Sequence, residues 1–434
     1  MKISVFGTGY VGLVTATCLA KLGNDVLCFD IDRDKINDLN NLKVSIYEPG
    51  LTSLIKKYQK LGRLKFTNNP HRISNFSRVN FICVGTPQDS NGFAQLRYVY
   101  SAASLINFRP TKKTLVVIKS TVPPGTAVKL KEYIHKEKKI PFENLDVASN
   151  PEFLREGSAI KDFMHPNRIV VGLNNKNYKN TFKKIYGSLA KKLIFMGPSS
   201  SEMTKYASNI FLASKISLIN EISNICEITG ANIDEVKIGV GLDKRIGSAF
   251  LNPGPGYGGS CFPKDVSAMV KHAQSLNYDP YLIKSIEKFN AKQKLKVFRN
   301  LKSKLGDLKD KQILIWGAAF KAETDDIRES PTLDLLKKLI SSKARIELYD
   351  PKAINNISKE FNTPLIKYLK NKFDCNDKVD ALVIMTEWNE FIISPAKLQK
   401  NINTKLIIDA RNLYKIESFK NLNIEYISFG RSKQ

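Results

Sequence analysis

A glycine-rich turn near the start of the chain constrains the fold more than any other feature of the sequence. Residues 2–6 are apolar and β-prone, and they run directly into the sequence GTGYVG. In a strand–turn–helix unit of this kind, Gly7 permits a tight turn, Gly9 lets a pyrophosphate approach the backbone, and Gly12 allows close helix–strand packing. Asp30 ends the second predicted strand about 20 residues later, where an acid binds a ribose hydroxyl and disfavours NADP. The pattern predicts a dinucleotide-binding α/β domain with NAD as its cofactor.

The apolar pattern further along the chain predicts two such α/β domains joined by helices. Short β-prone segments alternate with helix-sized intervals, which is typical of a parallel sheet with helices on both faces. The predicted strands are Lys2–Phe6, Val26–Phe29, Phe81–Val84, Thr114–Ile118, Val147–Ser149, Ile169–Val171, Gln312–Ile315, Arg345–Tyr349, Ala381–Met385 and Leu406–Asp409. We therefore expect two Rossmann-like, doubly wound domains at residues 1–198 and 306–434, with a central helical domain at 199–305.

The predicted central domain opens with a long helix. Residues 199–229 contain neither Gly nor Pro, and Gly230 stands where a helix C-terminal cap is expected. Ser199 and Glu202 have the spacing of a capping box at the helix start. A second helical stretch is predicted over about Pro280–Leu305. A helix as long as the first usually bridges domains or builds an oligomer interface, and we expect a homodimer.

Composition excludes several classes of protein. The chain has 434 residues, a hydrophobic fraction of 42% and a net charge of +27, with Lys pairs spread along most of its length. A basic chain can bind nucleic acid, but no basic stripe with interleaved aromatic residues is present, so we expect solvated helix faces and no nucleic-acid partner. No apolar run is long enough for a membrane span, and the N-terminus lacks the apolar core of a signal peptide. We expect a cytoplasmic protein without a metal site, since only four His are present and no CxxC pair occurs.

One of the six cysteines lies in a setting that favours reactivity. Residues 252–265 read NPGPGYGGSCFPKD, in which Cys261 follows four glycines and precedes a predicted helix. A helix N-terminus and the nearby Lys264 both favour the thiolate. Cys18, Cys28, Cys83 and Cys226 lie on apolar faces or strands and are predicted core residues, and Cys375 has no assigned role. A nicotinamide cofactor together with a nucleophilic cysteine implies oxidation of an alcohol to an aldehyde, trapping as a thiohemiacetal, a second oxidation to a thioester, and hydrolysis to an acid.

Three further segments carry polar residues suited to a ligand site. Residues 150–157 place two acids at the end of a predicted strand, where open α/β sheets bind ligands. Lys205 and Asn209 lie four residues apart and share one face of the long helix. Lys321 and the sequence DDIRES at 325–330 follow the first strand of the second α/β domain. Each segment alone is equally compatible with an ordinary loop or a solvated helix start.

Taken together and in order, these segments resemble the UDP-glucose/GDP-mannose dehydrogenase family over essentially the whole chain. The matching stretches are GTGYVG at 7–12, VGTP at 84–87, KSTVPPGT at 119–126, NPEFLREGSAIKDF at 150–163, EMTKYASNIFLASKISLINE at 202–221, LDKRIG at 242–247, FLNPGPGYGGSCFPKD at 250–265, FKAETDDIRES at 320–330 and IIDARN at 407–412. The resemblance implies oxidation of a nucleotide sugar at C6 by two NAD, supplying polysaccharide synthesis. Ser260 and Lys264 resemble the branch that acts on UDP-glucose, with UDP-N-acetylhexosamines and GDP-mannose left as alternative substrates.

The resemblance also implies roles for individual residues. Cys261 would form the covalent intermediates, Lys205 and Asn209 would stabilise negative charge at the sugar oxygen, and Asp265 would support proton transfer. Glu152 would assist thioester hydrolysis, with Thr121 placing the water. The implied NAD set is Gly7, Gly9, Val11, Gly12, Asp30, Lys35, Thr86, Thr121, Glu156, Lys264 and Arg328. The implied substrate set is Glu152, Phe153, Leu154, Arg155, Glu156, Lys205, Asn209, Arg245, Phe250, Leu251, Asn252, Pro253, Gly254, Gly258, Lys321 and Arg411. Arg245 matches a position that in some relatives reaches the site of a neighbouring subunit.

Overall fold

The computed structural model describes residues 1–431, and the chain divides into two compact units. The first unit is Met1–Ser208 and the second begins at Asn209. The division falls inside one helix, α9 (Pro198–Thr229), so both units contain part of it. No helix among the described residues combines the length and apolarity needed to cross a membrane.

The first unit is built on an eight-stranded sheet with the order β3-β2-β1-β4-β5-β6-β7-β8. All neighbouring strands are parallel except β6 and β7, which pair antiparallel through Ser149 and Gly172. The strands are β1 Lys2–Phe6, β2 Asp25–Phe29, β3 Leu64–Thr67, β4 Val79–Ile82, β5 Thr114–Ile118, β6 Leu145–Ser149, β7 Ile169–Gly172 and β8 Leu193–Met196. The strand order reverses at β1, which pairs with both β2 and β4. Ligands of open α/β sheets bind beside such a reversal, at the carboxyl ends of the strands.

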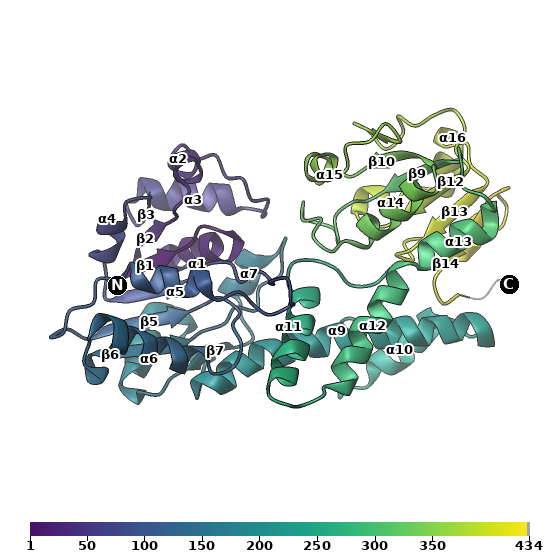
Figure 1. Ribbon diagram of the computed structural model, residues 1–434. Helices are drawn as coiled ribbons and strands as arrows, with labels where there is room; N and C mark the ends of the chain where they lie inside the picture. Colours follow the sequence, from purple (N-terminus) through teal and green to yellow (C-terminus); the bar gives the residue numbers. More distant parts are fainter. Residues whose placement is uncertain (432–434) are drawn as a thin grey trace. The chain divides into compact units, whose positions relative to one another are not determined.

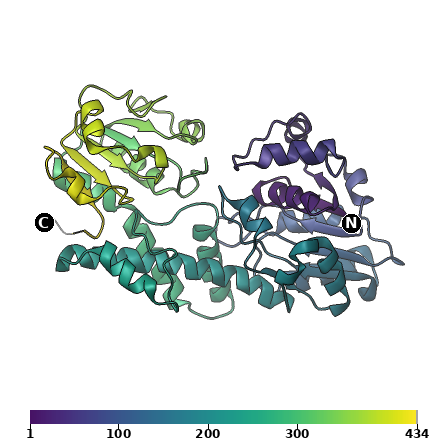
Figure 2. The same cartoon turned by 180° about the vertical axis from the view of Figure 1, so that it is seen from behind.

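Helices cover both faces of this sheet (Figures 1 and 2). They are α1 Tyr10–Lys21, α2 Arg33–Asn40, α3 Leu51–Lys60, α4 Pro70–Ser74, α5 Arg97–Ser104, α6 Thr126–Lys138, α7 Ala159–Met164 and α8 Lys179–Tyr186, with 3₁₀ turns η1 Phe142–Asn144, η2 Lys176–Tyr178 and η3 Gly187–Lys192. Apolar side chains of α1, α3, α7 and α8 pack with one face of the sheet, and those of α4, α5 and α6 pack with the other. The sheet is therefore buried on both sides, as its nearly uninterrupted apolar strands require.

The second unit contains helices followed by a six-stranded parallel sheet with the order β11-β10-β9-β12-β13-β14. Its strands are β9 Gln312–Trp316, β10 Arg345–Tyr349, β11 Ile366–Tyr368, β12 Ala381–Ile384, β13 Leu406–Asp409 and β14 Glu425–Ser428. Its helices are α10 Ile233–Leu242, α11 Phe262–Ser275, α12 Tyr281–Lys294, α13 Lys296–Leu305, α14 Pro331–Ser341, α15 Ile354–Glu360 and α16 Pro395–Asn401, with turns η4 Asn389–Phe391 and η5 Ile416–Phe419. Both sheets share one strand order about their reversal points, which confirms the predicted pair of Rossmann-like α/β domains and the long central helix.

Several predicted element limits differ from the structure. The fourth strand of the first sheet covers Val79–Ile82 and not Phe81–Val84, and the helical stretch at 280–305 is broken at Leu295 into α12 and α13. Helix α9 begins at Pro198, and Gly230 follows it with a φ of 81°, as a C-terminal glycine cap requires. The domain boundaries at 198/199 and 305/306 stay a prediction.

Candidate active site

The glycine turn between β1 and α1 has the geometry that a bound pyrophosphate needs. Gly7 has a φ of 99°, and a Cβ there would lie 2.9 Å from the carbonyl oxygen of Cys83. A Cβ on Gly12 would lie 2.1 Å from the carbonyl oxygen of Gly7, so only glycine fits between turn and helix. A Cβ on Gly9 would meet no atom within 4 Å. Gly7 and Gly12 thus serve the turn itself, whereas the open face of Gly9 leaves room for a ligand at the start of α1.

Asp30 closes this turn from the end of β2. Its Oδ2 accepts hydrogen bonds from the Thr8 backbone N–H (2.8 Å) and hydroxyl (2.7 Å), and Lys35 Nζ lies 3.6 Å away. Burial works to raise the pKa of Asp30, but the bonds from Thr8 and Asp32 and the Lys35 charge outweigh it and lower the pKa. The carboxylate is therefore charged at neutral pH, which suits a ribose hydroxyl donor and opposes a 2′-phosphate. The turn and Asp30 together fit NAD.

The remaining cofactor residues divide between the units. Thr86 and Thr121 meet in the first unit, where the Thr86 hydroxyl donates to the Thr121 carbonyl oxygen (2.8 Å). Val11, Lys35 and Glu156 also belong to this unit and are partly exposed. Lys264 and Arg328 belong to the second unit, where the Arg328 guanidinium pairs with Asp326 (2.7 Å).

A buried ion pair joins the predicted base to the long helix. Lys205 Nζ of α9 lies 2.9 Å from Glu152 Oε1, and both side chains are almost completely buried. The other oxygen of Glu152 accepts the Leu154 N–H at 2.5 Å. Burial alone would raise the pKa of Glu152, but the Lys205 charge and these hydrogen bonds outweigh it and lower the pKa. Glu152 is thus held as a carboxylate that can accept a proton.

The chain that follows Glu152 is fixed by its neighbours. Two cations lie near the centre of the Phe153 ring, the Arg168 guanidinium carbon at 3.8 Å and Lys205 Nζ at 5.5 Å. The Arg155 guanidinium is held by Asp162 through Nε (3.0 Å) and Nη2 (2.6 Å). A cavity of about 40 Å³ lies beside Glu152, Phe153 and Leu154, which is enough for a water.

Glu202 does not form the predicted capping box. Its Oε2 accepts the Gly125 N–H (2.7 Å) and its Oε1 accepts the Ala127 N–H (2.8 Å), at the start of α6. The side chain therefore satisfies the free N–H groups of another helix, which begins five residues after Thr121. The i, i+3 spacing with Ser199 could not reveal partners that lie 75 and 77 residues away.

In the second unit, the predicted nucleophile stands at a helix N-terminus. Cys261 is the residue directly before α11 and is partly exposed, with its Sγ 3.6 Å from Ser260 Oγ. One turn into the helix, the buried Asp265 carboxylate accepts from the Asn209 side-chain amide (2.6 Å) and pairs with Lys264 Nζ. The structure thus groups Cys261, Lys264, Asp265 and Asn209. The other four cysteines predicted as core residues are all buried.

The loop before Cys261 is braced by amide side chains. The Asn290 side chain bonds both the N–H and the carbonyl of Tyr257, at 2.8 and 3.0 Å. The Gly254 N–H donates to Asn220 Oδ1 (2.7 Å), and its carbonyl accepts from Gln293 Nε2 (2.9 Å). A Cβ on Gly258 would lie 2.3 Å from the Glu329 carbonyl oxygen. At Gly258, a residue that the resemblance assigns to the substrate, the close approach is thus by the chain's own backbone.

The other predicted substrate residues of the second unit differ in their exposure and in their partners. Arg411 donates to the carbonyl oxygens of Phe320 (2.7 Å) and Met385 (2.8 Å) and lies against Gly254. The partly buried Lys321 follows Phe320 directly. Along the loop itself, Leu251, Pro253 and Gly254 are buried, Phe250 is partly buried and Asn252 is exposed. Arg245 is exposed and pairs with Asp243 (2.6 Å).

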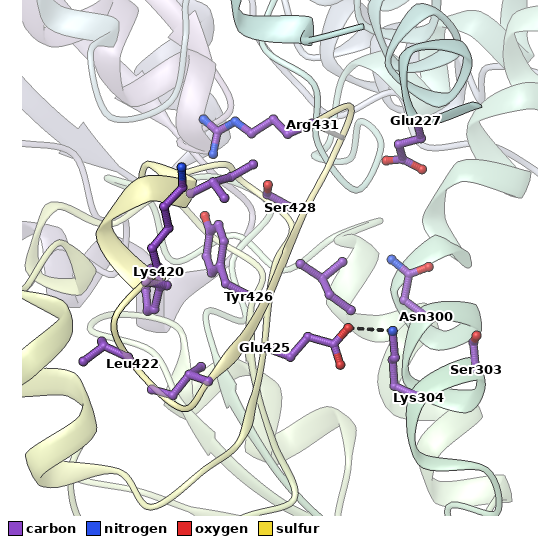
Figure 3. A pocket seen from close by; sticks show the side chains of 14 residues that line it. Glu227, Asn300, Ser303, Lys304, Lys420, Leu422, Glu425, Tyr426, Ser428 and Arg431 are labelled. Atoms are coloured by element: carbon purple, nitrogen blue, oxygen red, sulfur yellow. Dashed lines mark ion pairs between the residues drawn. The ribbon is translucent and has the colours of Figure 1, made fainter. Parts of the chain in front are cut away.

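A pocket of about 570 Å³ in the second unit contains none of these residues. Figure 3 shows it between α13 and the strand β14, with Lys304 Nζ paired across it to Glu425 Oε1 at 2.6 Å. A second cation of its lining, Arg431, pairs with Asp234. This pocket therefore shares no lining residue with the candidate site.

Sequence reasoning missed two buried charged residues of the first unit. Lys119 has its Nζ 3.4 Å from Asn150 Oδ1, and burial lowers its pKa to about 8. Glu48 accepts hydrogen bonds from the Tyr10 hydroxyl and the Gly157 N–H. The sequence signal for Lys119 was its place at the start of the matching stretch KSTVPPGT, and that for Glu48 was a charged residue directly before a Pro-Gly turn.

Comparison with known protein families matches most of the chain in three parts. Residues 1–190 match the NAD binding domain of the UDP-glucose/GDP-mannose dehydrogenase family, residues 199–292 its central domain, and residues 314–416 its UDP binding domain. The UDP-glucose 6-dehydrogenase of Rickettsia bellii is 40% identical over 99% of both chains. The UDP-glucose 6-dehydrogenase YwqF of Bacillus subtilis is 42% identical over 99% of this chain and 98% of its own.

A solved structure agrees with these sequence matches. The UDP-glucose dehydrogenase of the archaeon Pyrobaculum islandicum superposes with a TM-score of 0.89 at 33% identity, covering 98% of this chain and 96% of that one. The described fold, the glycine turn with Asp30 and the full-length matches all agree. The chain belongs to the UDP-glucose/GDP-mannose dehydrogenase family.

Proposed function

We propose that the protein is an NAD-dependent UDP-glucose 6-dehydrogenase, which oxidises the C6 alcohol of UDP-glucose to the carboxylate of UDP-glucuronate. The observation that carries the proposal is the partly exposed Cys261 at the start of α11, in a chain whose first unit has a dinucleotide turn. A simple alcohol dehydrogenase has no need of a cysteine, whereas an enzyme that makes an acid does. The full-length similarity to UDP-glucose 6-dehydrogenases supports the choice of sugar.

Cys261 is the residue that forms the covalent intermediates in this proposal. Bound NAD supplies the acceptor for one hydride in each of the two oxidations. The Cys261 thiolate adds to the C6 aldehyde to give a thiohemiacetal, whose oxidation leaves a thioester. Lys205 and the Asn209 amide donate hydrogen bonds to the C6 oxygen, which carries negative charge as the thiolate adds. The Asp265 carboxylate, which already accepts from Asn209, supports the proton transfers.

Glu152 is the proposed general base for hydrolysis of the thioester. Its lowered pKa makes it a carboxylate that removes a proton from water, and the water attacks the thioester and releases Cys261 as a thiol. The cavity beside Glu152 can hold a water, and Thr121 is proposed to place the attacking one. The buried ion pair between Lys205 and Glu152 would keep the Glu152 carboxylate oriented during the oxidations.

The binding residues complete the proposal. The NAD set is the one given under "Sequence analysis", centred on Gly9 and Asp30. The nucleotide sugar is proposed to contact residues 152–156 in the first unit, and Phe250–Gly254, Gly258, Lys321 and Arg411 in the second. Lys321 and Arg411 are cations suited to phosphate or sugar oxygens. We retain the three-domain division at 1–198, 199–305 and 306–434 as part of this proposal.

A homodimer that works in the cytoplasm is the proposed assembly. On α9, the exposed side chains of Phe211, Leu218 and Ile225 recur every seven residues and form an apolar stripe. An identical stripe on a second copy is its self-complementary partner. The free thiol that the mechanism needs persists in a reducing compartment, which supports the cytoplasm.

The test is the stoichiometry of NADH against sugar. Purified protein with NAD and UDP-glucose is expected to yield two NADH for each UDP-glucuronate formed. The Cys261→Ala variant is expected to form no UDP-glucuronate while still binding NAD. Cys375→Ala is the matched control, since Cys375 is also a partly buried free thiol but lies in a distant segment of the sequence.

Other outcomes would contradict parts of the proposal. One NADH per sugar would remove Cys261 from the mechanism. Turnover of GDP-mannose or a UDP-N-acetylhexosamine in place of UDP-glucose would keep the chemistry and change the substrate. Normal UDP-glucuronate formation by Cys261→Ala would overturn the covalent mechanism.

A further inference from the structure

Glu48 is a buried carboxylate that the proposed reaction does not use. It lies just before α3 and is 6% exposed. Three donors surround it: the Tyr10 hydroxyl and the Gly157 N–H (2.8 Å) both reach Oε2, and the Ile160 N–H (3.4 Å) reaches Oε1. Among the described residues, no Lys or Arg forms an ion pair with it. Its charge is therefore met by hydrogen bonds alone, which are strong when the acceptor is ionised.

The donors come from two segments that lie more than 140 residues apart in the sequence. Tyr10 follows Gly9 directly and is the first residue of α1, so it belongs to the dinucleotide turn. Gly157 follows Glu156 and precedes α7, at the end of the segment proposed to hold the nucleotide sugar. One carboxylate oxygen thus connects the turn proposed for NAD to the segment proposed for the sugar, entirely within the first unit.

The carboxylate itself is held firmly. The Glu48 carbonyl accepts from the Leu51 N–H (3.1 Å), and Leu51 and Ile55 of α3 are fully buried in the same core as α1. Burial, the Glu48 hydrogen bond and the charges of Glu48 and Glu156 all raise the pKa of Tyr10. Tyr10 therefore keeps its proton at any physiological pH and stays a donor to Glu48.

We propose that Glu48 is a positioning residue that couples NAD binding at residues 7–12 to nucleotide-sugar binding at residues 152–156. The inference rests on the proposed function. A ligand that orders one segment also orders the shared carboxylate and, through it, the other segment. The second ligand then loses less conformational entropy when it binds, which is positive coupling between sites.

The test measures NAD affinity by calorimetry with and without saturating UDP-glucuronate, which occupies the sugar site without turnover. For the wild type we expect UDP-glucuronate to tighten NAD binding by about fivefold or more, the lower end of usual coupling. Glu48→Gln is expected to lower this ratio towards one, because a neutral amide oxygen accepts from Tyr10 and Gly157 more weakly than a carboxylate oxygen does. Its amide nitrogen also cannot accept from the Ile160 N–H. Tyr10→Phe removes a single donor and is expected to lower the ratio in the same direction.

Two controls keep a structural role separate from a coupling role. Tyr10→Phe preserves the carboxylate and its backbone donors, so it remains informative if Glu48→Gln fails to fold. Glu137→Gln removes an exposed carboxylate of α6 and is expected to leave the ratio unchanged. Thermal melting of each variant reports any loss of stability independently of the ratio.

The outcomes distinguish the inference from the function on which it rests. A lowered melting temperature with an unchanged coupling ratio in both variants would show a purely structural Glu48 and overturn the inference. A wild-type ratio of one would also overturn it, while leaving the dehydrogenase activity intact. A wild type that binds no NAD would overturn the proposed function, and the inference with it.

Discussion

Hydrogen bonds and burial shift the pKa of Glu202 in opposite directions. Both of its oxygens accept backbone N–H groups at the start of α6, which favours the ion. Burial is the larger effect and raises its pKa from 4.5 to about 7. In the unfolded chain the carboxyl loses its proton near pH 4.5, so between pH 4.5 and 7 the folded state holds a proton that the unfolded state has released. The contribution of Glu202 to stability therefore falls as pH rises through this window.

The Glu202→Gln variant tests this sign, because glutamine does not titrate. We expect the free energy of unfolding of the wild type, relative to the variant, to fall between pH 5 and pH 8 by up to about 3 kcal/mol, at about 1.4 kcal/mol per pKa unit. Urea unfolding at intervals across this range measures it. A difference that stays constant, or that rises with pH, would show that the hydrogen bonds from α6 outweigh burial.

At the residue scale, the sequence indicates candidate site residues more readily than it indicates their hydrogen-bond partners. Motifs place Cys261, Asp30 and Glu152 relative to nearby elements, and their roles stay predictions. Most hydrogen-bond donors to Glu202 and Glu48 lie 75 or more residues away in the sequence. Tertiary packing brings them together, so no local spacing in the sequence predicts them. The glycine at 258 likewise serves the backbone of Glu329, which is 71 residues further along.

The β1–α1 turn separates glycines needed for folding from a glycine needed for binding. Gly12→Ala places a Cβ 2.1 Å from the Gly7 carbonyl oxygen, whereas Gly9→Ala places one where no protein atom lies within 4 Å. We expect Gly12→Ala to destabilise the protein by about 1–3 kcal/mol, the usual cost of overpacking. Gly9→Ala is expected to leave the melting temperature near that of the wild type and to weaken NAD binding at least tenfold.

Thermal melting and NAD titration on the two variants provide the measurement. Each variant adds one methyl group to the same six-residue turn, so each serves as the control for the other. Unchanged NAD affinity in Gly9→Ala would mean that the pyrophosphate does not approach the turn at this residue.

At the element scale, the sequence predicted the alternation of strands and helices but not all of their limits. The edge strands of both sheets, β3, β8, β11 and β14, were missed, since each is three or four residues long and carries exposed or partly exposed side chains. The break at Leu295 was missed because no Gly or Pro marks it; α12 and α13 meet at a single residue with a ψ of 0°. Such limits are set by packing against neighbouring elements and not by the residues themselves.

At the scale of the whole molecule, the two sheets have the same strand order and the same glycine and aspartate positions, but the two aspartates have different surroundings. Gly317, with a φ of 103°, follows β9 as Gly7 follows β1, and Asp350 follows β10 as Asp30 follows β2. The Asp350 carboxylate accepts the N–H groups of Ala318, Ala319, Lys352 and Ala353 and the Trp388 indole N–H. It is fully engaged and buried, whereas Asp30 remains partly exposed. The same strand order thus gives one turn open to a dinucleotide ribose and one whose acid is structural.

The apolar stripe on α9, formed by Phe211, Leu218 and Ile225, predicts the interface of a homodimer. Leu218 lies at the middle of the stripe and is 59% exposed. In a symmetric dimer the Leu218→Lys substitution places two ammonium groups in one apolar interface, and uncompensated charges there weaken association strongly. We expect the mass measured by size exclusion with light scattering at micromolar concentration to fall from two chains to one. Leu61→Lys is the matched control, because Leu61 is also 59% exposed but lies at the end of α3. A wild type that is already monomeric, or a Leu218→Lys protein that remains dimeric, would place the interface elsewhere or remove it.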